Sequence, residues 1–94
     1  MFASLVMQRL ELQIPNKLGL HARPAAKLVQ LASLFSSAIQ IIYKGRKANA
    51  KSIMGVLMLA AGFGAKVIFE IEGQDEDVAA KAIAALVHEG FGET

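Results

Sequence analysis

The stretch Gly19-Leu20-His21-Ala22-Arg23-Pro24-Ala25 decides how this chain folds, because it separates an extended segment from a helix. Gly19 interrupts the extended segment. Pro24 is tolerated only in the first turn of a helix, where its missing N–H would have had no intrahelical partner. The stretch therefore predicts a helix that begins near His21.

The apolar residues change their period across this stretch. Between Arg9 and Ile14 apolar and polar residues alternate, as in a half-buried strand, with Leu10, Leu12 and Ile14 on one face. From Ala22 to Phe35 the apolar residues recur at helical spacing and predict an amphipathic helix. Its apolar face contains Ala25, Leu28, Val29, Leu31, Ala32 and Phe35.

The remainder of the chain alternates between strand and helix patterns. Residues 38–43 are rich in isoleucine and predict a strand, which a turn at Gly45 connects to a short strand over 46–50. Ser52 resembles the N-cap of a short apolar helix that runs to Leu59 and is stopped by the turn over 62–64.

A final strand and helix complete the pattern. Residues 66–72 alternate, with Val67, Phe69 and Ile71 pointing inward. After Gly73, the acidic residues 75–77 suit the positive end of a helix. The predicted buried stripe of that helix is Ala79, Ala82, Ile83, Leu86 and Val87. The order βαββαβα predicts an α+β sandwich of two layers, with three helices on one face of the sheet.

Length and composition fit one domain over residues 1–94, since 94 residues with 54% apolar content fill one modest core. We expect residues 1–6 to form a frayed extension, with Met7 as an alternative start. Ten basic and eight acidic residues are scattered along the chain, which argues against nucleic acid as a partner. The lack of cysteine, of a signal sequence and of a membrane-spanning run predicts a cytoplasmic protein without membrane insertion.

His21 is the candidate reactive residue. At a helix N-cap, the partial positive charge of the helix disfavours imidazolium, and a neutral ring nitrogen can attack phosphorus. The free amides at Ala22 and Arg23 and the guanidinium of Arg23 could then hold the phosphoryl group through charge-assisted hydrogen bonds. The plainer interpretation is a capping histidine beside a solvated arginine.

The stretch over residues 16–27 and the string Lys51-Ser52-Ile53-Met54-Gly55-Val56-Leu57 resemble the HPr family of histidine-containing phosphocarriers. These proteins act in the bacterial phosphoenolpyruvate:sugar phosphotransferase system. The resemblance covers residues 7–92 and implies an open-faced sandwich with a four-stranded antiparallel sheet. It implies that enzyme I phosphorylates His21, with Nδ1 as the phosphorylated ring nitrogen. His21 would then pass the phosphoryl group to a histidine of an EIIA domain. Arg23 would pair with the phosphoryl oxygens during transfer. The resemblance implies no metal and no organic cofactor.

The string around Ser52 gives two further expectations. A serine N-cap needs no other explanation, yet HPr proteins of some bacteria are phosphorylated at the serine of this string by an HPr kinase/phosphorylase, so Ser52 is a candidate regulatory site. The short helix after it has more apolar residues than one face can bury, which predicts a docking surface of Ile53, Met54 and Leu57. We expect the chain to be a monomer.

Several alternatives stay open at this point. A regulatory binding module with the same surface, controlled at His21 or Ser52, competes with the carrier interpretation. The lead-in over residues 16–19 resembles nitrogen-related carriers called NPr, whereas the Ser52 string resembles sugar-system carriers. RNA binding is disfavoured by few clustered cations. His88 fits a structural role at the end of the last helix, and two distant histidines do not form a metal motif.

Overall fold

A computed structural model describes residues 7–93 and confirms the predicted order of elements. The elements are β1 (Gln8–Gln13), α1 (Ala22–Ala32), β2 (Ala38–Tyr43), β3 (Arg46–Asn49), α2 (Ile53–Met58), β4 (Lys66–Glu72), α3 (Glu76–His88) and the short 3-10 turn η2 (Gly90–Gly92). The predicted frayed extension over residues 1–6 lies outside the described residues.

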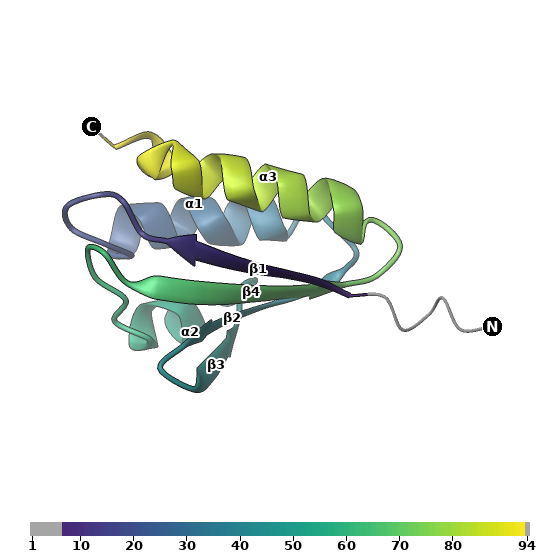
Figure 1. Ribbon diagram of the computed structural model, residues 1–94, viewed down its shortest axis with the longest axis horizontal. Helices are drawn as coiled ribbons and strands as arrows, with labels where there is room; N and C mark the ends of the chain where they lie inside the picture. The colour runs from purple at the N-terminus through teal and green to yellow at the C-terminus, as the bar shows by residue number, and fades with distance from the viewer. Residues whose placement is uncertain (1–6, 94) are drawn as a thin grey trace.

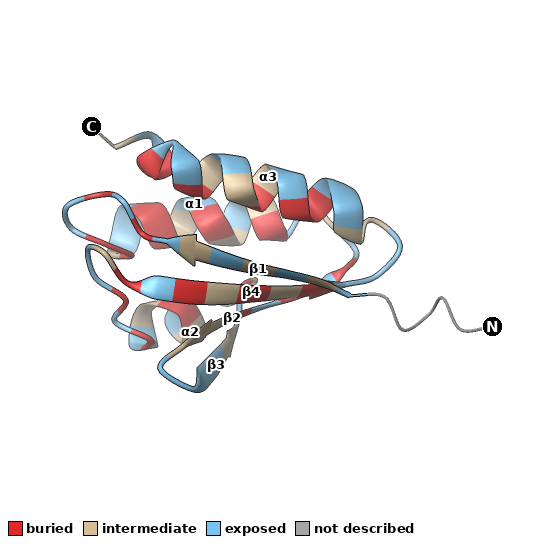
Figure 2. Ribbon diagram, viewed as in Figure 1, coloured by how far each residue is buried: buried red, intermediate tan, exposed pale blue. Residues whose placement is uncertain are grey.

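The four strands form one antiparallel sheet in the order β1-β4-β2-β3, and the long helices α1 and α3 cover one face of it (Figure 1). In this register Leu10 lies opposite Phe69, which lies opposite Ile41, so the apolar residues of three strands form a continuous inner face. The central strand β4 alternates buried and more exposed residues (Figure 2). The structure therefore has the open-faced, two-layer architecture that the sequence predicted.

The connection between β2 and β3 is a two-residue hairpin turn. Lys44 and Gly45 both have positive φ values, 52° and 77°, as a type I′ turn requires. The third strand ends at Asn49 rather than at Ala50, whose N–H still donates to the Ile39 carbonyl at 2.9 Å. The predicted hairpin is confirmed.

Two predicted helix ends are wrong. α1 ends at Ala32 and not at Phe35, because the backbone tightens after Ser33, where Leu34 N–H donates to the Leu31 carbonyl. α2 ends at Met58, before the predicted glycine turn, because Ala60 adopts a left-handed φ of 54°.

The buried stripe of α3 is also rotated from the predicted one. Ala80 is buried, whereas Ala82 and Leu86 are partly exposed. This difference follows from the position of the helix, since α3 packs against both β1 and β4. Within residues 7–93 no helix is long and apolar enough to span a bilayer.

Asp75 links the loop after α1 to the start of α3. Its carboxylate accepts hydrogen bonds from the backbone N–H groups of Ser36 and Ser37, at 2.9 and 3.0 Å, and from the Ser37 hydroxyl. The Ser37 hydroxyl and the two amides lower the pKa of Asp75 to about 2. The ionised carboxylate therefore joins two loops that are far apart in sequence.

We expect Asp75→Asn to lower the melting temperature by roughly 5 °C near pH 6. The pKa of Asp75 is lower in the folded state than in the unfolded state. Asp75 therefore stabilises the fold above pH 3.8, and this stabilisation is lost as the pH falls towards 2. The difference in melting temperature between Asp75→Asn and the parent should therefore shrink between pH 5 and pH 2. A difference that stays constant over this range would contradict the account, and the exposed Glu72→Gln is the control.

Gly19 determines how the loop before α1 meets the loop after α2. Its φ is +68°, and a Cβ at this position would lie 2.5 Å from the Gly62 Cα and 2.6 Å from the Ala61 carbonyl oxygen. The next residue, Leu20, donates its N–H to that carbonyl at 2.8 Å. A side chain at residue 19 would thus strain the backbone and separate the two loops.

Gly19→Ala should destabilise the fold by at least about 2 kcal/mol, because the Cβ adds a backbone clash to the cost of a left-handed conformation. Gly62→Ala is the matched control, since a Cβ on Gly62 would meet nothing within 4 Å. Chemical denaturation of both variants tests this, and equal stability of the two would show that the close approach at Gly19 is unimportant.

Candidate functional site

His21 lies at the N-cap of α1, where the sequence predicted the helix to begin. Its backbone is extended, with φ −77° and ψ −170°, and its carbonyl accepts the first helical hydrogen bond, from Ala25 N–H at 2.9 Å. Pro24 lies in the first turn and is buried. The imidazole makes no capping hydrogen bond and is 35% exposed, so the ring is accessible from solvent.

The first turn of α1 presents unpaired backbone donors next to this ring. The N–H groups of Ala22 and Arg23 have no hydrogen-bond acceptor among the described residues, and Pro24 has no N–H. The first turn contains no acidic side chain, and both Ala22 and Arg23 are exposed. This arrangement suits an anion such as a phosphoryl group.

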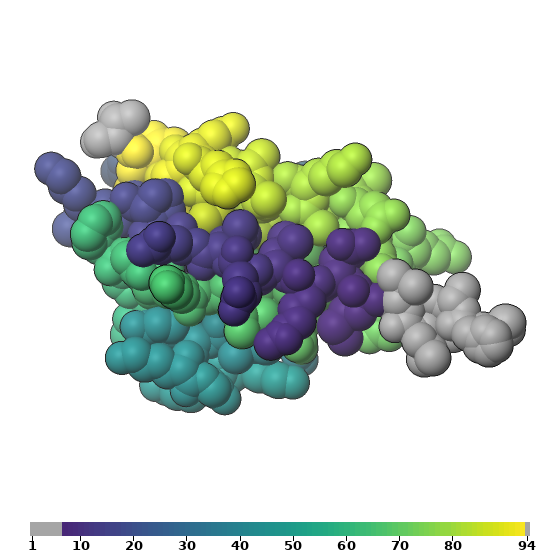
Figure 3. Space-filling view, viewed as in Figure 1, coloured from purple at the N-terminus to yellow at the C-terminus, as the bar shows by residue number. Residues whose placement is uncertain are grey.

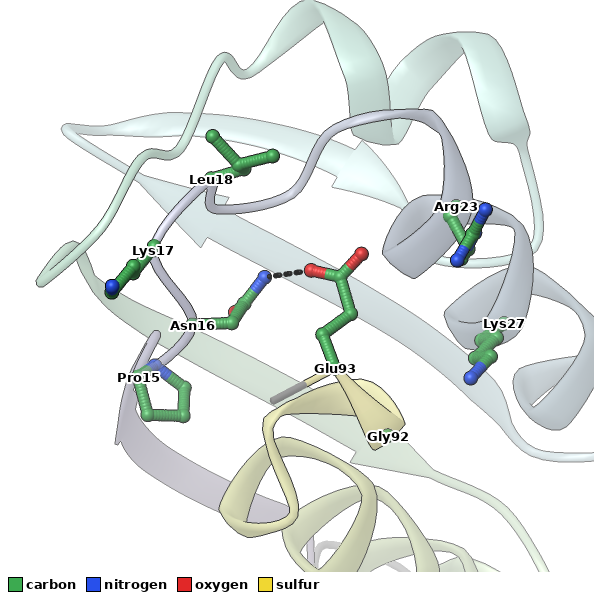
Figure 4. A pocket seen from close by; sticks show the side chains of 8 residues that line it. All are labelled: Pro15, Asn16, Lys17, Leu18, Arg23, Lys27, Gly92 and Glu93. Carbon is green, nitrogen blue, oxygen red and sulfur yellow. Dashed lines mark hydrogen bonds between the residues drawn. The ribbon is translucent and has the colours of Figure 1, made fainter.

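An open cleft of about 760 Å³ lies beside α1 (Figure 4). Arg23 and Lys27 line it from the helix, and the loop before the helix lines the opposite side. Glu93 stands between the two walls. In Figure 3 the C-terminal segment meets this loop at one end of the molecule. The complete lining is Pro15, Asn16, Lys17, Leu18, Arg23, Lys27, Gly92 and Glu93.

Glu93 is a site residue that sequence reasoning missed. Its Oε2 lies 2.8 Å from the His21 Nε2, and its Oε1 accepts a hydrogen bond from the Asn16 Nδ2 at 2.9 Å. The hydrogen bond with His21 lowers the pKa of the Glu93 carboxyl, and Asn16 and the charge of Arg23 act in the same direction. Seventy-two positions separate Glu93 from His21, and no periodic pattern in the sequence connects them.

Ser52 caps α2 as predicted, since its hydroxyl accepts a hydrogen bond from Gly55 N–H at 3.2 Å. It lies at the end of α2 that is remote from His21. Lys51 Nζ donates to the Phe35 carbonyl beyond the end of α1, whereas Ala61, after α2, contacts Leu20. The two helices are therefore antiparallel, and the structure does not bring Ser52 to the imidazole.

The predicted docking residues differ in exposure. Met54 is 63% exposed and Ile53 is 38% exposed, but Leu57 is half-buried and packs against the core. The prediction of an exposed Leu57 is wrong because the six-residue helix turns this position inward, and Met58 is exposed instead. The sequence also gave no sign that Leu18 and Phe63 are exposed on the two loops that meet at Gly19.

His88 lies in the last turn of α3, as predicted from the sequence. It is exposed and far from His21 along the chain. Among residues 7–93 no group of three or more histidine and acidic side chains is arranged to hold a metal ion.

Comparison with known proteins gives consistent matches. A family model described as "PTS HPr component phosphorylation site" matches residues 8–89. The chain is 55% identical over 80 residues to phosphocarrier protein HPr of Cupriavidus necator, covering 85% of this chain and 90% of that one. It is 48% identical over 89 residues to phosphocarrier protein NPr of Shewanella violacea, covering 93% and 98%.

Solved structures agree with these matches. A crystal structure of HPr from Thermoanaerobacter tengcongensis superimposes with a TM-score of 0.90 at 47% identity, covering 93% of this chain and 98% of that one. A crystal structure of an HPr dimer from the same organism gives a TM-score of 0.75 at 50% identity, covering 87% and 94%.

The fold is an open-faced sandwich with an accessible histidine at the start of its first helix, and phosphocarriers match nearly the whole chain. These features define a small phosphoryl carrier protein. The chain belongs to the HPr family of the phosphotransferase system.

Proposed function

We propose that His21 is the phosphoryl-carrying residue, which receives its group from phosphorylated enzyme I and gives it to a histidine of an EIIA domain. The observation that carries this proposal is the accessible imidazole at the start of α1, beside two unpaired backbone donors. Nδ1 is the proposed acceptor atom, because Nε2 contacts Glu93 and no described residue hydrogen-bonds to Nδ1.

The transfer needs only groups of this chain and its partners. The lone pair of Nδ1 forms a bond to phosphorus as the bond to the donor atom of enzyme I breaks, and the breaking bond leaves its electrons on that donor atom. Arg23 pairs with the phosphoryl oxygens as charge moves, and the amides of Ala22 and Arg23 add hydrogen bonds. No metal or organic cofactor has a role in this step within the chain.

Regulation is a second candidate function of this chain. The lead-in over residues 16–19 resembles nitrogen-related carriers, and a protein named NPr is 48% identical to this chain, whereas a protein named HPr is 55% identical. In a nitrogen-type or otherwise regulatory branch, the phosphorylation state at His21 would control binding rather than sugar uptake. Assaying transfer to a sugar-type and to a nitrogen-type EIIA side by side distinguishes the two branches.

Ser52 is the proposed regulatory site for an HPr kinase/phosphorylase. Ser52 is half-buried, and a phosphoryl group there would add negative charge beside Ile53 and Met54. The proposal fails if a competent kinase leaves Ser52 unmodified.

The exposed residues Ile53 and Met54, with Met58 beside them on α2, form the proposed docking surface for enzyme I and EIIA. Leu57, which the sequence placed in this surface, packs against the core instead. A monomeric state and a cytoplasmic location remain predictions. Light scattering in solution tests the first, since a related HPr has been crystallised as a dimer.

Incubation with enzyme I, magnesium and phosphoenolpyruvate should add one acid-labile phosphoryl group to the chain. His21→Ala should abolish this addition, and His88→Ala should leave it unchanged. Intact mass spectrometry before and after acid treatment measures the result. An intact, folded chain that gains no phosphate from a competent cognate enzyme I would overturn the proposed carrier chemistry.

Met54→Asp should slow phosphoryl transfer from enzyme I by about tenfold, because a buried charge at an apolar contact costs on the order of 1–2 kcal/mol. Ser52→Asp should slow transfer in the same direction. Val78→Asp is the matched control, since Val78 is similarly exposed (61%) but lies on α3. If Met54→Asp and Val78→Asp had equal effects on transfer, or if Met54→Asp acted only through lost stability, α2 would not be the docking surface.

A further inference from the structure

The C-terminal segment after α3 is anchored to the domain. Gly90, Phe91 and Gly92 have φ values of 64°, 59° and 76°, which turn the chain back towards α1. The Phe91 side chain is fully buried in the core, and its carbonyl accepts a hydrogen bond from Lys27 Nζ at 2.8 Å. This segment therefore delivers Glu93 to a fixed position beside the imidazole.

The Glu93 carboxylate is held on both of its oxygens. Oε2 lies 2.8 Å from His21 Nε2, and Oε1 accepts from Asn16 Nδ2 at 2.9 Å. Asn16 is only 6% exposed, and its Nδ2 also donates to the Gly19 carbonyl at 2.8 Å, so two acceptors fix its orientation. The carboxylate thus has little freedom to leave the ring.

An ionised carboxylate only accepts hydrogen bonds, so the contact requires a proton on Nε2. We propose that Glu93 is a positioning residue that keeps this proton on Nε2 before and after phosphorylation. In the neutral ring the lone pair then belongs to Nδ1, which is the atom that must attack phosphorus. This inference rests on the proposed role of His21 as the phosphoryl carrier.

The same proton matters when the group is passed on. As the bond between phosphorus and Nδ1 breaks, its electron pair stays on Nδ1 while the acceptor nitrogen forms the new bond. With a proton held on Nε2 the ring leaves as neutral imidazole, whereas without it the ring would leave as the much poorer leaving group imidazolate.

Glu93 is also the one carboxylate among the residues that line the cleft, and the other charged groups there are Lys17, Arg23 and Lys27. Arg23 is exposed, and its charge lowers the pKa of the Glu93 carboxyl, which favours the ionised form that accepts from Nε2. The Arg23 guanidinium can therefore pair with the phosphoryl oxygens while Glu93 holds the ring proton.

Glu93→Gln tests the proposal, because glutamine keeps the shape but removes the charge and presents a donor as well as an acceptor. The control is Glu89→Gln, which removes an exposed carboxylate at the end of α3. Transfer from each phosphorylated chain to an EIIA domain is followed between pH 6 and pH 9. Glu93→Gln should transfer roughly five- to tenfold more slowly at pH 8 and approach the parent rate at pH 6, where the solvent supplies the ring proton. Equal rates at every pH, or a loss that does not change with pH, would overturn the proposal.

A second measurement does not depend on phosphorylation. Nitrogen-15 NMR of the neutral imidazole should show His21 of the parent and of Glu89→Gln protonated at Nε2, and a mixture of both tautomers in Glu93→Gln, with His88 unchanged throughout. An unchanged His21 tautomer in Glu93→Gln would refute the role of Glu93. This result is obtained even if the chain accepts no phosphate, so it separates failure of this inference from failure of the proposed carrier function.

Discussion

The close approach of two loops at Gly19 is the constraint on which the rest of the site depends. With no Cβ at residue 19, the loop before α1 contacts the backbone at Ala61 and Gly62, and Leu20 donates to the Ala61 carbonyl. This contact determines where α1 begins over the sheet. It consequently sets where His21 faces solvent and where the loop after α2 presents its apolar side chains. One glycine thus connects the start of α1, where His21 lies, to the loop after α2, where Phe63 is exposed.

Different charged groups around His21 stabilise the phosphoryl anion and the proton on the ring. The free backbone amides at the start of α1 and the guanidinium of Arg23 favour an anion beside the ring. Glu93, held by Asn16 and by the anchored C-terminal segment, favours a proton on Nε2. A carrier must release its phosphoryl group as readily as it accepts it, and this division of charge stabilises the group without binding it tightly.

The sequence predicted the fold well because each strand and long helix has a regular apolar period, and the strand over 38–43 and the strand over 66–72 have their predicted bounds. Prediction from the sequence failed at positions where local backbone geometry determines the structure. α2 is too short for its period to show that Leu57 turns inward, and no signal before Ala60 marks a left-handed helix end. The start of α1 at His21 was predictable from Gly19 and Pro24. Glu93 was not, because only the tertiary fold brings the last turn of the chain to the first helix.

His21 is proposed to carry the phosphoryl group on Nδ1 because Glu93 holds Nε2. Phosphorus–nitrogen coupling in the NMR spectrum of the phosphorylated, nitrogen-15-labelled chain identifies the bonded atom and tests this directly. We expect coupling to Nδ1 of His21, with the proton retained on Nε2. Coupling to Nε2, or phosphorus attached to any other residue, would contradict it.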